Sequence, residues 1–183
     1  MPRYVALLRA INVGGHVVKM DALRAHFMAM GFTDVATFIA SGNVLFTASG
    51  AGKAKPATLE RTIAKALEEA LGYSVATFLR TPAQMAAAAA HGPFGAPAAN
   101  DTRYVGFLEA PLDAAGRRAL AAFNTDVDEF AAHAGEVHWR CRVRSSDSTF
   151  VLKKFEKAIG QAATFRNVTS VRKLAALLSN EAK

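Results

Sequence analysis

The sequence predicts an α+β protein built from two ferredoxin-like halves in tandem, packed into one compact unit. Short apolar runs alternate with helical periodicity in the order strand, helix, strand, strand, helix, strand and helix. A segment rich in proline and glycine, residues 91–100, then interrupts the pattern. The same order recurs after it, so we expect an N-terminal half at residues 1–92 and a C-terminal half at residues 100–183.

The first half opens with an apolar run at residues 4–13 that only Arg9 interrupts, which predicts a strand buried on both faces. Apolar residues then recur every three or four positions until Gly31, which stands where helices often end. In order, the expected elements are a strand at 4–13, a helix at 20–30, hairpin strands at 34–40 and 44–47, a helix at 58–71, a strand at 75–79 and a helix opened by Pro82.

The second half repeats this order. Its expected elements are a strand at 104–108, a helix at 112–123, hairpin strands at 129–133 and 137–143, a helix at 149–159, a short strand at 163–165 and a helix at 168–178. In both halves a strand ending in arginine, Arg80 or Arg166, leads into a helix. The matching order argues for an internal duplication.

The composition fits a folded protein of a reducing compartment. Of its 183 residues, 51% are hydrophobic and 20% are charged, which excludes a disordered chain. The single cysteine, Cys141, excludes an internal disulfide. No apolar stretch approaches the roughly 20 residues needed to span a bilayer, and the first residues lack the pattern of a secretory leader. We therefore expect a cytoplasmic protein with no membrane partner, whose net charge of +7 favours anionic partners.

Several motifs together resemble the bacterial family called domain of unknown function 1697. They are YVALLRAINVGG at 4–15, KMDALR at 19–24, GF at 31–32, SGNVLF at 41–46 and TFRNVTSVRKL at 164–174. The resemblance runs nearly end to end and in the right order. It implies a compact α+β chain with ferredoxin-like elements and no agreed activity. The chain departs from the family pattern at Val168, where tryptophan is usual, and at Ala10, where glycine is usual.

Polar and glycine residues gather at one predicted edge of the first sheet. In a ferredoxin-like sheet the first and third strands are antiparallel central neighbours, so the end of one lies beside the start of the other. This arrangement brings together Arg9, Asn12, Gly14, Gly15, Ser41, Gly42 and Asn43, with Lys19 near the start of the next helix.

This edge has two interpretations. In the first, glycine N–H groups, Lys19 and the Arg9 guanidinium bind a phosphate or carboxylate. In the second, the glycines turn the chain and Asn12 hydrogen-bonds the backbone of the hairpin, so the corner only supports the fold. The spacing matches neither a Walker loop nor a dinucleotide fingerprint.

A second candidate surface is basic. Period-two alternation places Arg140, Arg142 and Arg144 on one face of the strand at 137–143 and Trp139 with Cys141 on the other. The whole predicted patch comprises Arg140, Arg142, Arg144, Lys153, Lys154, Arg166, Asn167 and Lys173. Such a cluster suits nucleic acid, ideally with exposed aromatic side chains, which the parity of Trp139 does not supply. The alternative is a solvated strand face that protects a sheet edge from aggregation.

Catalytic and metal motifs are scarce, so we expect no metal and no cofactor. The five histidines include no pair at metal-ligand helical spacing; His133 and His138, which face each other across their predicted hairpin, are the one weak exception. Cys141 falls on an apolar strand face and is expected in the core rather than as a nucleophile.

The sequence favours binding of an anionic ligand without catalysis, either nucleic acid or a phosphorylated small molecule. One alternative is a small-molecule enzyme or sensor that uses Arg9, Asn12 and Asn43. Another is a protein–protein interaction module, which leaves a homodimer open.

Overall fold

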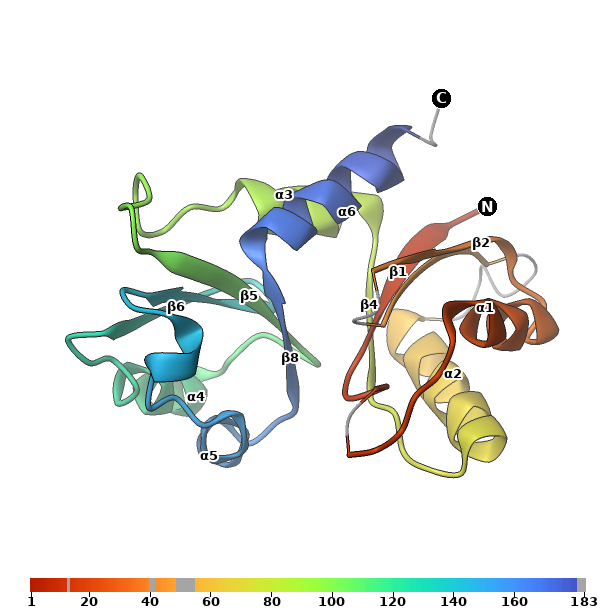
Figure 1. Cartoon of the computed structure of the whole chain (residues 1–183), viewed down its shortest axis with the longest axis horizontal. Helices are drawn as coiled ribbons and strands as arrows, with labels where there is room; N and C mark the ends of the chain where they lie inside the picture. The colour runs from red at the N-terminus through yellow and green to blue at the C-terminus, as the bar shows by residue number, and fades with distance from the viewer. Residues whose placement is uncertain (13, 40–41, 49–54, 181–183) are drawn as a thin grey trace. The chain divides into compact units, whose positions relative to one another are not determined.

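The protein is described by a computed structural model, which covers residues 1–12, 14–39, 42–48 and 55–180. The chain divides into two compact units, Met1–Ala86 with Leu174–Lys183 and Ala87–Lys173. The described residues form six α-helices and two four-stranded antiparallel sheets, one sheet in each unit (Figure 1). The α+β class that the sequence predicts is therefore confirmed.

The first sheet follows the predicted order of elements. In chain order these are β1 (Arg3–Leu8), α1 (Met20–Ala29), β2 (Thr33–Phe38), β3 (Asn43–Thr47), α2 (Pro56–Leu71), β4 (Thr77–Arg80) and α3 (Pro82–Ala90). The strands lie in the order β2-β3-β1-β4, and every neighbouring pair is antiparallel. The first and third strands are thus central neighbours, as the sequence predicts.

Strand β1 is shorter than the apolar run that predicts it. The N–H groups of Leu8 and Arg9 donate to the carbonyl oxygens of Gly42 and Ala76, both at 2.8 Å. The next residue, Ala10, has φ +59°, a left-handed conformation that ends an extended strand. The prediction of a strand through residue 13 is therefore wrong beyond Leu8, and residue 13 itself lies outside the described residues.

The core of the first unit lies between its sheet and the helices α1 and α2. Both helices lie on the same side of the sheet (Figure 1). Ala6 and Phe46 point to that side, because side chains alternate along a strand, and they pack with Phe27 of α1 and with Ile63 and Leu67 of α2. All five side chains are fully buried, so this contact holds both helices on the sheet.

The second unit repeats the arrangement. Its elements are β5 (Thr102–Leu108), α4 (Ala114–Ala121), β6 (Asp128–His133), β7 (Glu136–Cys141), a 3-10 turn (Ser145–Asp147), α5 (Leu152–Ile159), β8 (Ala163–Asn167) and the start of α6 (Val168–Asn180). The strand order is β6-β7-β5-β8, so each strand occupies the same place as its counterpart four strands earlier in the first sheet. Strand β7 ends two residues before the predicted limit of 143, so Arg142 and Arg144 do not belong to the strand, and the predicted alternation does not apply to them.

The core of the second unit confirms the predicted parity of β7. Trp139 and Cys141 are buried on the face that Phe155 of α5 and Leu120 of α4 cover. The Trp139 Nε1–H donates to the buried Asp128 carboxylate at 2.8 Å, which satisfies the indole in the core. Burial raises the pKa of the Cys141 thiol, so this group is a core residue rather than an activated nucleophile.

None of the helices in the described part of the chain has both the length and the apolar composition that crossing a bilayer requires.

Candidate functional site

The predicted polar corner of the first unit is a contact between the end of β1 and the start of β3. A Cβ atom placed on Gly42 would lie 2.7 Å from Cγ2 of Ile11 and 3.1 Å from Cβ of Leu8, so the two segments touch. The segments that follow β1 and precede β3 are therefore neighbours, as predicted. Ser41, a predicted member of this corner, lies outside the described residues.

Two asparagines form hydrogen bonds within this corner. Oδ1 of Asn12 accepts from the N–H of Val18 at 2.7 Å, which closes the loop leading to α1. Nδ2 of the fully buried Asn43 donates to the carbonyl oxygen of Phe38 at 2.9 Å, which closes the β2–β3 hairpin. Both bonds support the fold, but the observed partner of Asn12 is Val18 in the loop before α1, whereas the sequence predicted the backbone of the hairpin.

The loop before α1 is held by an aromatic contact that the sequence did not suggest. The Tyr73 hydroxyl donates to the carbonyl oxygen of Ile11 at 2.8 Å, and the ring of His16 stacks on Tyr73 at a centroid distance of 3.9 Å. Such contacts between residues far apart in the sequence cannot be inferred from a local motif.

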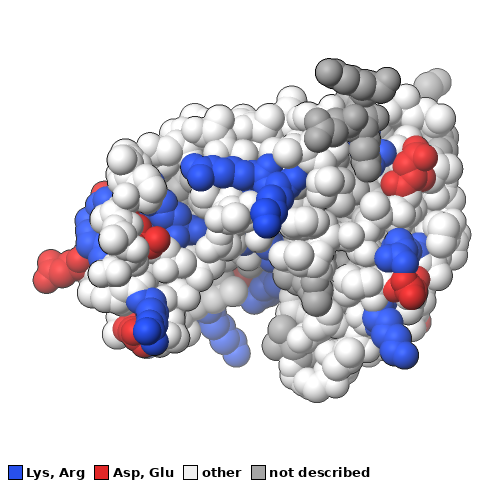
Figure 2. Space-filling view, turned by 45° about the horizontal axis from the view of Figure 1, so that its top comes forward, with Lys and Arg blue, Asp and Glu red and all other residues white. Residues whose placement is uncertain are grey.

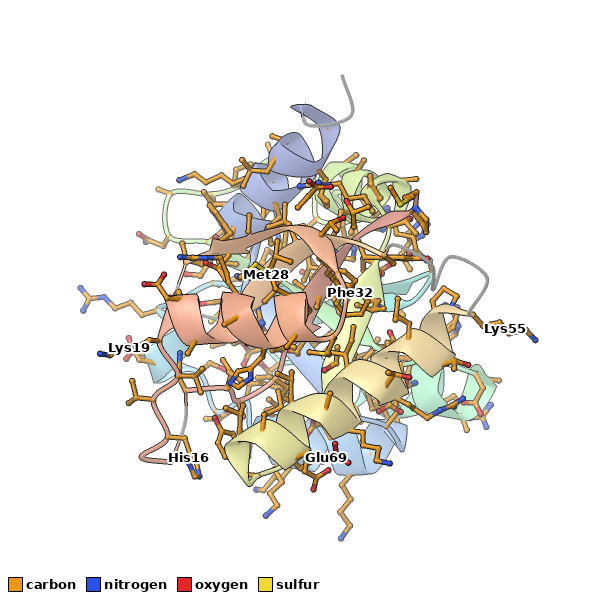
Figure 3. The ribbon with its side chains drawn as sticks, turned by 90° about the vertical axis from the view of Figure 1, so that its right-hand side faces the viewer. His16, Lys19, Met28, Phe32, Lys55 and Glu69 are labelled. Carbon is orange, nitrogen blue, oxygen red and sulfur yellow. The ribbon has the colours of Figure 1, made fainter. Side chains whose placement is uncertain are left out.

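The other predicted residues of the corner lie along the same loop. Gly14 and Gly15 are exposed with φ of +70° and +88°, so they turn the chain. Lys19 directly precedes α1, and its exposed side chain points outward (Figure 3). Arg9 is half-buried after β1. The geometry fits turn formation, and a binding role for these residues stays a prediction.

The structure separates the residues of the predicted basic patch. Arg140 lies on the sheet face opposite the helices, whereas Lys153 and Lys154 are exposed on α5, which packs against the other face. The remaining members are Arg142 and Arg144 after β7, Arg166 and Asn167 at the end of β8 and Lys173 on α6. On the face shown in Figure 2, lysine and arginine side chains form separate groups, several of them beside acidic residues.

Arg166 is buried rather than displayed. Its Nη1 donates to Oγ1 of Thr164 at 2.8 Å and to the carbonyl oxygen of Phe165 at 3.0 Å. Burial lowers the pKa of Arg166 to about 10, so the group remains charged at neutral pH. Arg80, which the sequence places at the matching position, is also buried and donates to the carbonyl oxygen of Leu79 at 2.8 Å.

One face of the second sheet, opposite α4 and α5, carries ionisable residues on all four strands, and we call it the polar face. Its members are Arg103 of β5, Glu129 and His133 of β6, Glu136, His138 and Arg140 of β7, and Arg166 of β8. In the strand register Arg140 lies opposite Arg103 of β5 on one side and opposite Glu129 of β6 on the other. These three residues form a charged row that crosses three strands. A period of two along each strand places these residues together.

The charged row forms an ion-pair network. Arg140 pairs with Glu129 and lies 4.0 Å from the Asp101 carboxylate, while Arg142 binds the same Glu129 at 2.7 Å. Nη2 of Arg103 donates to Asp101 at 3.0 Å, and this bond holds the pKa of the carboxyl below its usual value. Three arginines share two carboxylates, so the network keeps a net positive charge.

Three histidines meet on the polar face. The His91 ring, which follows α3, stacks on His133 at a centroid distance of 3.9 Å and meets His138 edge-on at 4.7 Å. The cross-strand partner of His133 is Glu136, not His138, so the two strand histidines are joined through His91 rather than directly. No group of His, Cys, Asp or Glu in the described residues is arranged to hold a metal ion.

The surroundings of His138 and His91 favour their neutral forms. His138 is 2% exposed, and its Nε2 has no hydrogen-bond partner among the described residues. Burial, reinforced by His91 and His133, lowers the pKa of His138 to about 4. Burial and the neighbouring His133 also lower the pKa of His91, although Glu136 acts in the opposite direction.

The segment that follows His91 continues over the charged row. The ring of Phe94 lies 5.4 Å from Cζ of Arg140, a cation–π contact. Nη1 and Nη2 of Arg103 donate to the carbonyl oxygens of Gly95 and Ala96 at 2.7 and 3.0 Å. Residues 91–97 belong to the segment that the sequence places between the two halves, and they are bound to the polar face by side-chain contacts.

A pocket of about 200 Å³ lies where β5 begins, β8 ends and α6 starts. It is lined by Pro97, Asp101, Thr102, Arg103, Asn167, Val168, Thr169 and Arg172. The exposed Arg172 makes no hydrogen bond or ion pair with any other residue that the structure describes. Oδ1 of Asn167 accepts from the N–H of Thr169 at 2.8 Å, so a side chain orders the first turn of α6 at the pocket wall.

A smaller cavity of about 20 Å³, room for roughly one water molecule, shares Arg103, Val168 and Arg172 with this pocket. Its other walls include His91, Phe94, His138 and Trp139. The charged pocket and the histidine cluster are therefore adjacent parts of one site within the second unit.

Sequence reasoning missed most of this site. His91 and Arg103 belong to no motif, and Arg172 stands in the family-like segment but outside the predicted basic patch, which includes its neighbour in the pocket, Asn167. One local signal existed, because Thr169 and Arg172 are three residues apart in the first turns of a helix and so share a face.

Comparisons with known proteins establish a family and a fold. The sequence model of the family described as protein of unknown function (DUF1697) matches residues 1–138. Among solved structures, the conserved bacterial protein SP0830 from Streptococcus pneumoniae is similar, with a TM-score of 0.69 and 18% sequence identity over 98% of this chain and 99% of that one. No curated protein matches. The family model covers most of the chain, and the chain belongs to the DUF1697 family of proteins of unknown function.

Proposed function

We propose that this protein binds a small anionic molecule, a phosphate ester or a small carboxylate, in the pocket at the start of α6, and that it does so without catalysis. The single observation that carries the proposal is the convergence of Arg103, Arg172 and the first turn of α6 on one pocket of about 200 Å³.

Each part of this wall favours negative charge. Val168 and Thr169 of the first turn of α6 line the pocket, and the start of a helix carries the positive end of the helix dipole, which commonly favours phosphate; the Thr169 N–H is already donated to Asn167. Arginine offers planar, paired donors that match phosphate and carboxylate oxygens. Arg172 supports the proposal most directly, because its donors engage no other described residue. Asp101 opposes an anion, but its charge is already shared by Arg103 and Arg140.

The size of the pocket supports a small ligand. Pockets for drug-sized molecules usually have volumes of about 300–1,000 Å³. A pocket of about 200 Å³ fits a phosphate or carboxylate group with a short substituent.

A titration of the full chain with sulfate, inorganic phosphate and acetate, followed by amide NMR shifts at low ionic strength, tests the proposal. We expect saturable binding of at least one anion, with the largest shifts at Thr169 and Arg103. Arg172→Ala should weaken that binding about tenfold or more, because a charge-assisted hydrogen bond is lost.

Arg118→Ala is the matched control, because Arg118 is an exposed arginine of α4 in the same unit and its loss changes the net charge equally. We expect it to change the affinity less than about twofold. Equal weakening by both variants would mean that the anions sense only net charge, and the proposed site would then be wrong.

Nucleic acid receives less support than a small anion. Arg140 and Arg142 are engaged with carboxylates, and the only tryptophan is in the core; the aromatic ring beside the predicted patch, Phe94, is half-buried and packed against Arg140, so it is not an open stacking platform. Titration with single-stranded nucleic acid at two salt concentrations separates the two ligands, since phosphate-backbone binding weakens steeply with salt.

We also propose that each unit is a ferredoxin-like half and that the protein is cytoplasmic. The order β2-β3-β1-β4, its repetition as β6-β7-β5-β8 and the βαββαβ order of the elements support the first statement. The proposed halves at 1–92 and 100–183 differ from the compact units in two places, because the first unit ends its N-terminal part at Ala86 and also includes Leu174–Lys183. The single, buried cysteine supports a reducing compartment.

A further inference from the structure

Residues 91–97 and a bound anion would compete for the same guanidinium group. Nη1 and Nη2 of Arg103, which lines the anion pocket, are engaged by the carbonyl oxygens of Gly95 and Ala96. Pro97 is itself part of the pocket wall. When the segment leaves the polar face, Nη1 of Arg103 loses its carbonyl partner and Nη2 keeps only its bond to Asp101, so the guanidinium gains capacity for an anion.

The segment is attached to the sheet at three points: the ring contacts of His91, the contact of Phe94 with Arg140, and the bonds to Arg103. Only the first attachment involves groups that titrate near neutral pH. The half-buried His91 and the exposed His133 stack at 3.9 Å, a distance at which two protonated rings repel each other.

The surrounding charges do not offset protonation of this cluster. Glu136 of β7 is the acidic group beside His91, and the pKa of His91 is nevertheless lowered. The other ionisable groups of the polar face are the arginines of β5, β7 and β8, with Arg172 of α6 beside the cavity; Glu129 of β6 is paired with two arginines. An added proton therefore enters a region whose fixed charge is mainly positive.

We propose that His91, His133 and His138 form a proton-operated latch, which holds residues 91–97 on the polar face at neutral pH and releases them on acidification to expose Arg103 to the anionic ligand. The inference rests on the proposed function for its ligand, but the latch itself can be observed without any ligand.

The sign of the effect follows from the burial of the rings. Both His91 and His138 bind protons less readily in the closed form than a free histidine of pKa 6.5 does. The released form therefore takes up protons first as the pH falls below about 6.5, and the ratio of closed to released segment drops by up to about tenfold per pH unit for each proton taken up.

The experiment follows the full chain by NMR between about pH 7.5 and pH 4.5, where an ordinary histidine changes its charge. Imidazole shifts report the protonation of each histidine, and heteronuclear NOE values of the Gly92, Phe94 and Gly95 amides report the order of the segment. Fluorescence of Trp139, the only tryptophan, gives a second readout because it lines the small cavity with His91 and Phe94.

We expect the three amides to lose order, and Trp139 fluorescence to change, with the midpoint at which His91 is protonated. The double variant H91F/H133F keeps an aromatic stack but cannot be protonated there, so its segment should stay ordered. H26Q, which removes a histidine of α1 outside the cluster, should behave as the wild type. If H91F/H133F does not fold, the wild type alone decides the question. The latch then requires that the loss of amide order and the protonation of His91 have the same midpoint pH.

Sulfate, whose charge is constant over this range, tests the link to the pocket. Wild-type affinity at about pH 5 should exceed that at pH 7.5 by at least about fivefold, a typical coupling between sites, and the double variant should show a smaller ratio. A segment that stays ordered to pH 4.5, or a double variant that titrates like the wild type, would overturn the latch. Release without sulfate binding at either pH would support the latch and overturn the proposed function.

Discussion

Two residues at the end of β1 and before β3, Ala10 and Gly42, show how a single backbone position shapes the corner. Both have positive φ, +59° and +77°, a region that costs a residue with a Cβ atom about 1–2 kcal/mol. Gly42 avoids this cost and Ala10 does not. Glycine is the residue that the left-handed conformation at Ala10 favours.

Ala10→Gly should therefore stabilise the protein by about 1 kcal/mol, because it removes a Cβ atom from a left-handed position. Urea unfolding of the variant should show a higher midpoint and an unchanged slope. The control is Ala25→Gly, the same change at an exposed position inside α1, which should destabilise by about 1 kcal/mol. Two changes of the same sign would contradict the argument.

Gly42→Ala should destabilise the protein by more than about 2 kcal/mol, because strain and overlap act together. The new Cβ atom would lie 2.7 Å from Cγ2 of Ile11, and it would occupy a φ of +77°. Gly14→Ala is the matched control, since Gly14 has φ +70° but no atom within 4 Å of its Cβ position. In thermal or urea unfolding, Gly14→Ala should lower the free energy of unfolding by about the conformational cost alone. If Gly42→Ala lowered it by the same amount, the contact with Ile11 would be unimportant.

At the scale of helices and strands, caps and turns decide where elements end. Asp113 is the N-cap that directly precedes α4, and its carboxylate accepts from the N–H of Gly116 at 2.7 Å. Asp113→Ala should cost about 1 kcal/mol, the usual value of an N-cap, whereas Asp126→Ala in a nearby loop should stay within about 0.5 kcal/mol. Urea unfolding measures the free energy of unfolding of both variants. Similar losses of stability would mean that the hydrogen bond of the cap contributes nothing beyond the negative charge of Asp113.

The sequence predicted the elements better than their ends. Apolar periodicity identified α1 and the strands of both sheets, because burial against one face sets the pattern. It extended β1 through residue 13 because the apolar run continues there, while the chain turns at Ala10 for a conformational reason that hydrophobicity does not encode. It extended β7 to residue 143 in the same way.

The candidate site was harder to predict, because its parts come from segments that only the fold brings together. His91 contacts two strands that lie more than 40 residues further along the chain, and nothing in its local sequence distinguishes it from a linker residue. Arg103 alternates in a strand like any surface arginine, yet it binds Asp101 and two carbonyl oxygens. A count of basic residues found the positive charge of this region but not its partners.

At the scale of the whole molecule, the net charge of +7 is a poor guide to where an anion binds. Arg140 and Arg142 share Glu129, and Arg166 is buried in the second sheet. Exposed ion pairs contribute little to stability, but they occupy donors that a ligand would otherwise use. A few uncommitted groups such as Arg172 therefore matter more for binding than the total charge.

The burial of ionisable groups predicts how the stability of the whole protein depends on pH. The pKa of His138 falls from 6.5 in the unfolded chain to about 4 in the folded one, so the unfolded state binds its proton first. The free energy of unfolding should then decline as the pH drops from about 6.5 towards 4, by at most about 1.4 kcal/mol per pH unit for this group. Asp101 acts in a separate window, since its pKa is lowered from 3.8 and its contribution is lost only below that value.

Replacing His138 with methionine, which has a similar volume and no charge, should flatten the decline between pH 6.5 and 4 and leave the loss below pH 3.8 in place. Urea unfolding at a series of pH values measures both windows in one experiment. His26→Gln should retain the wild-type slope, because His26 lies on α1 away from the cluster. If His138→Met also retained that slope, burial of a neutral His138 would not be the source of the acid sensitivity, and the decline would have to come from other groups.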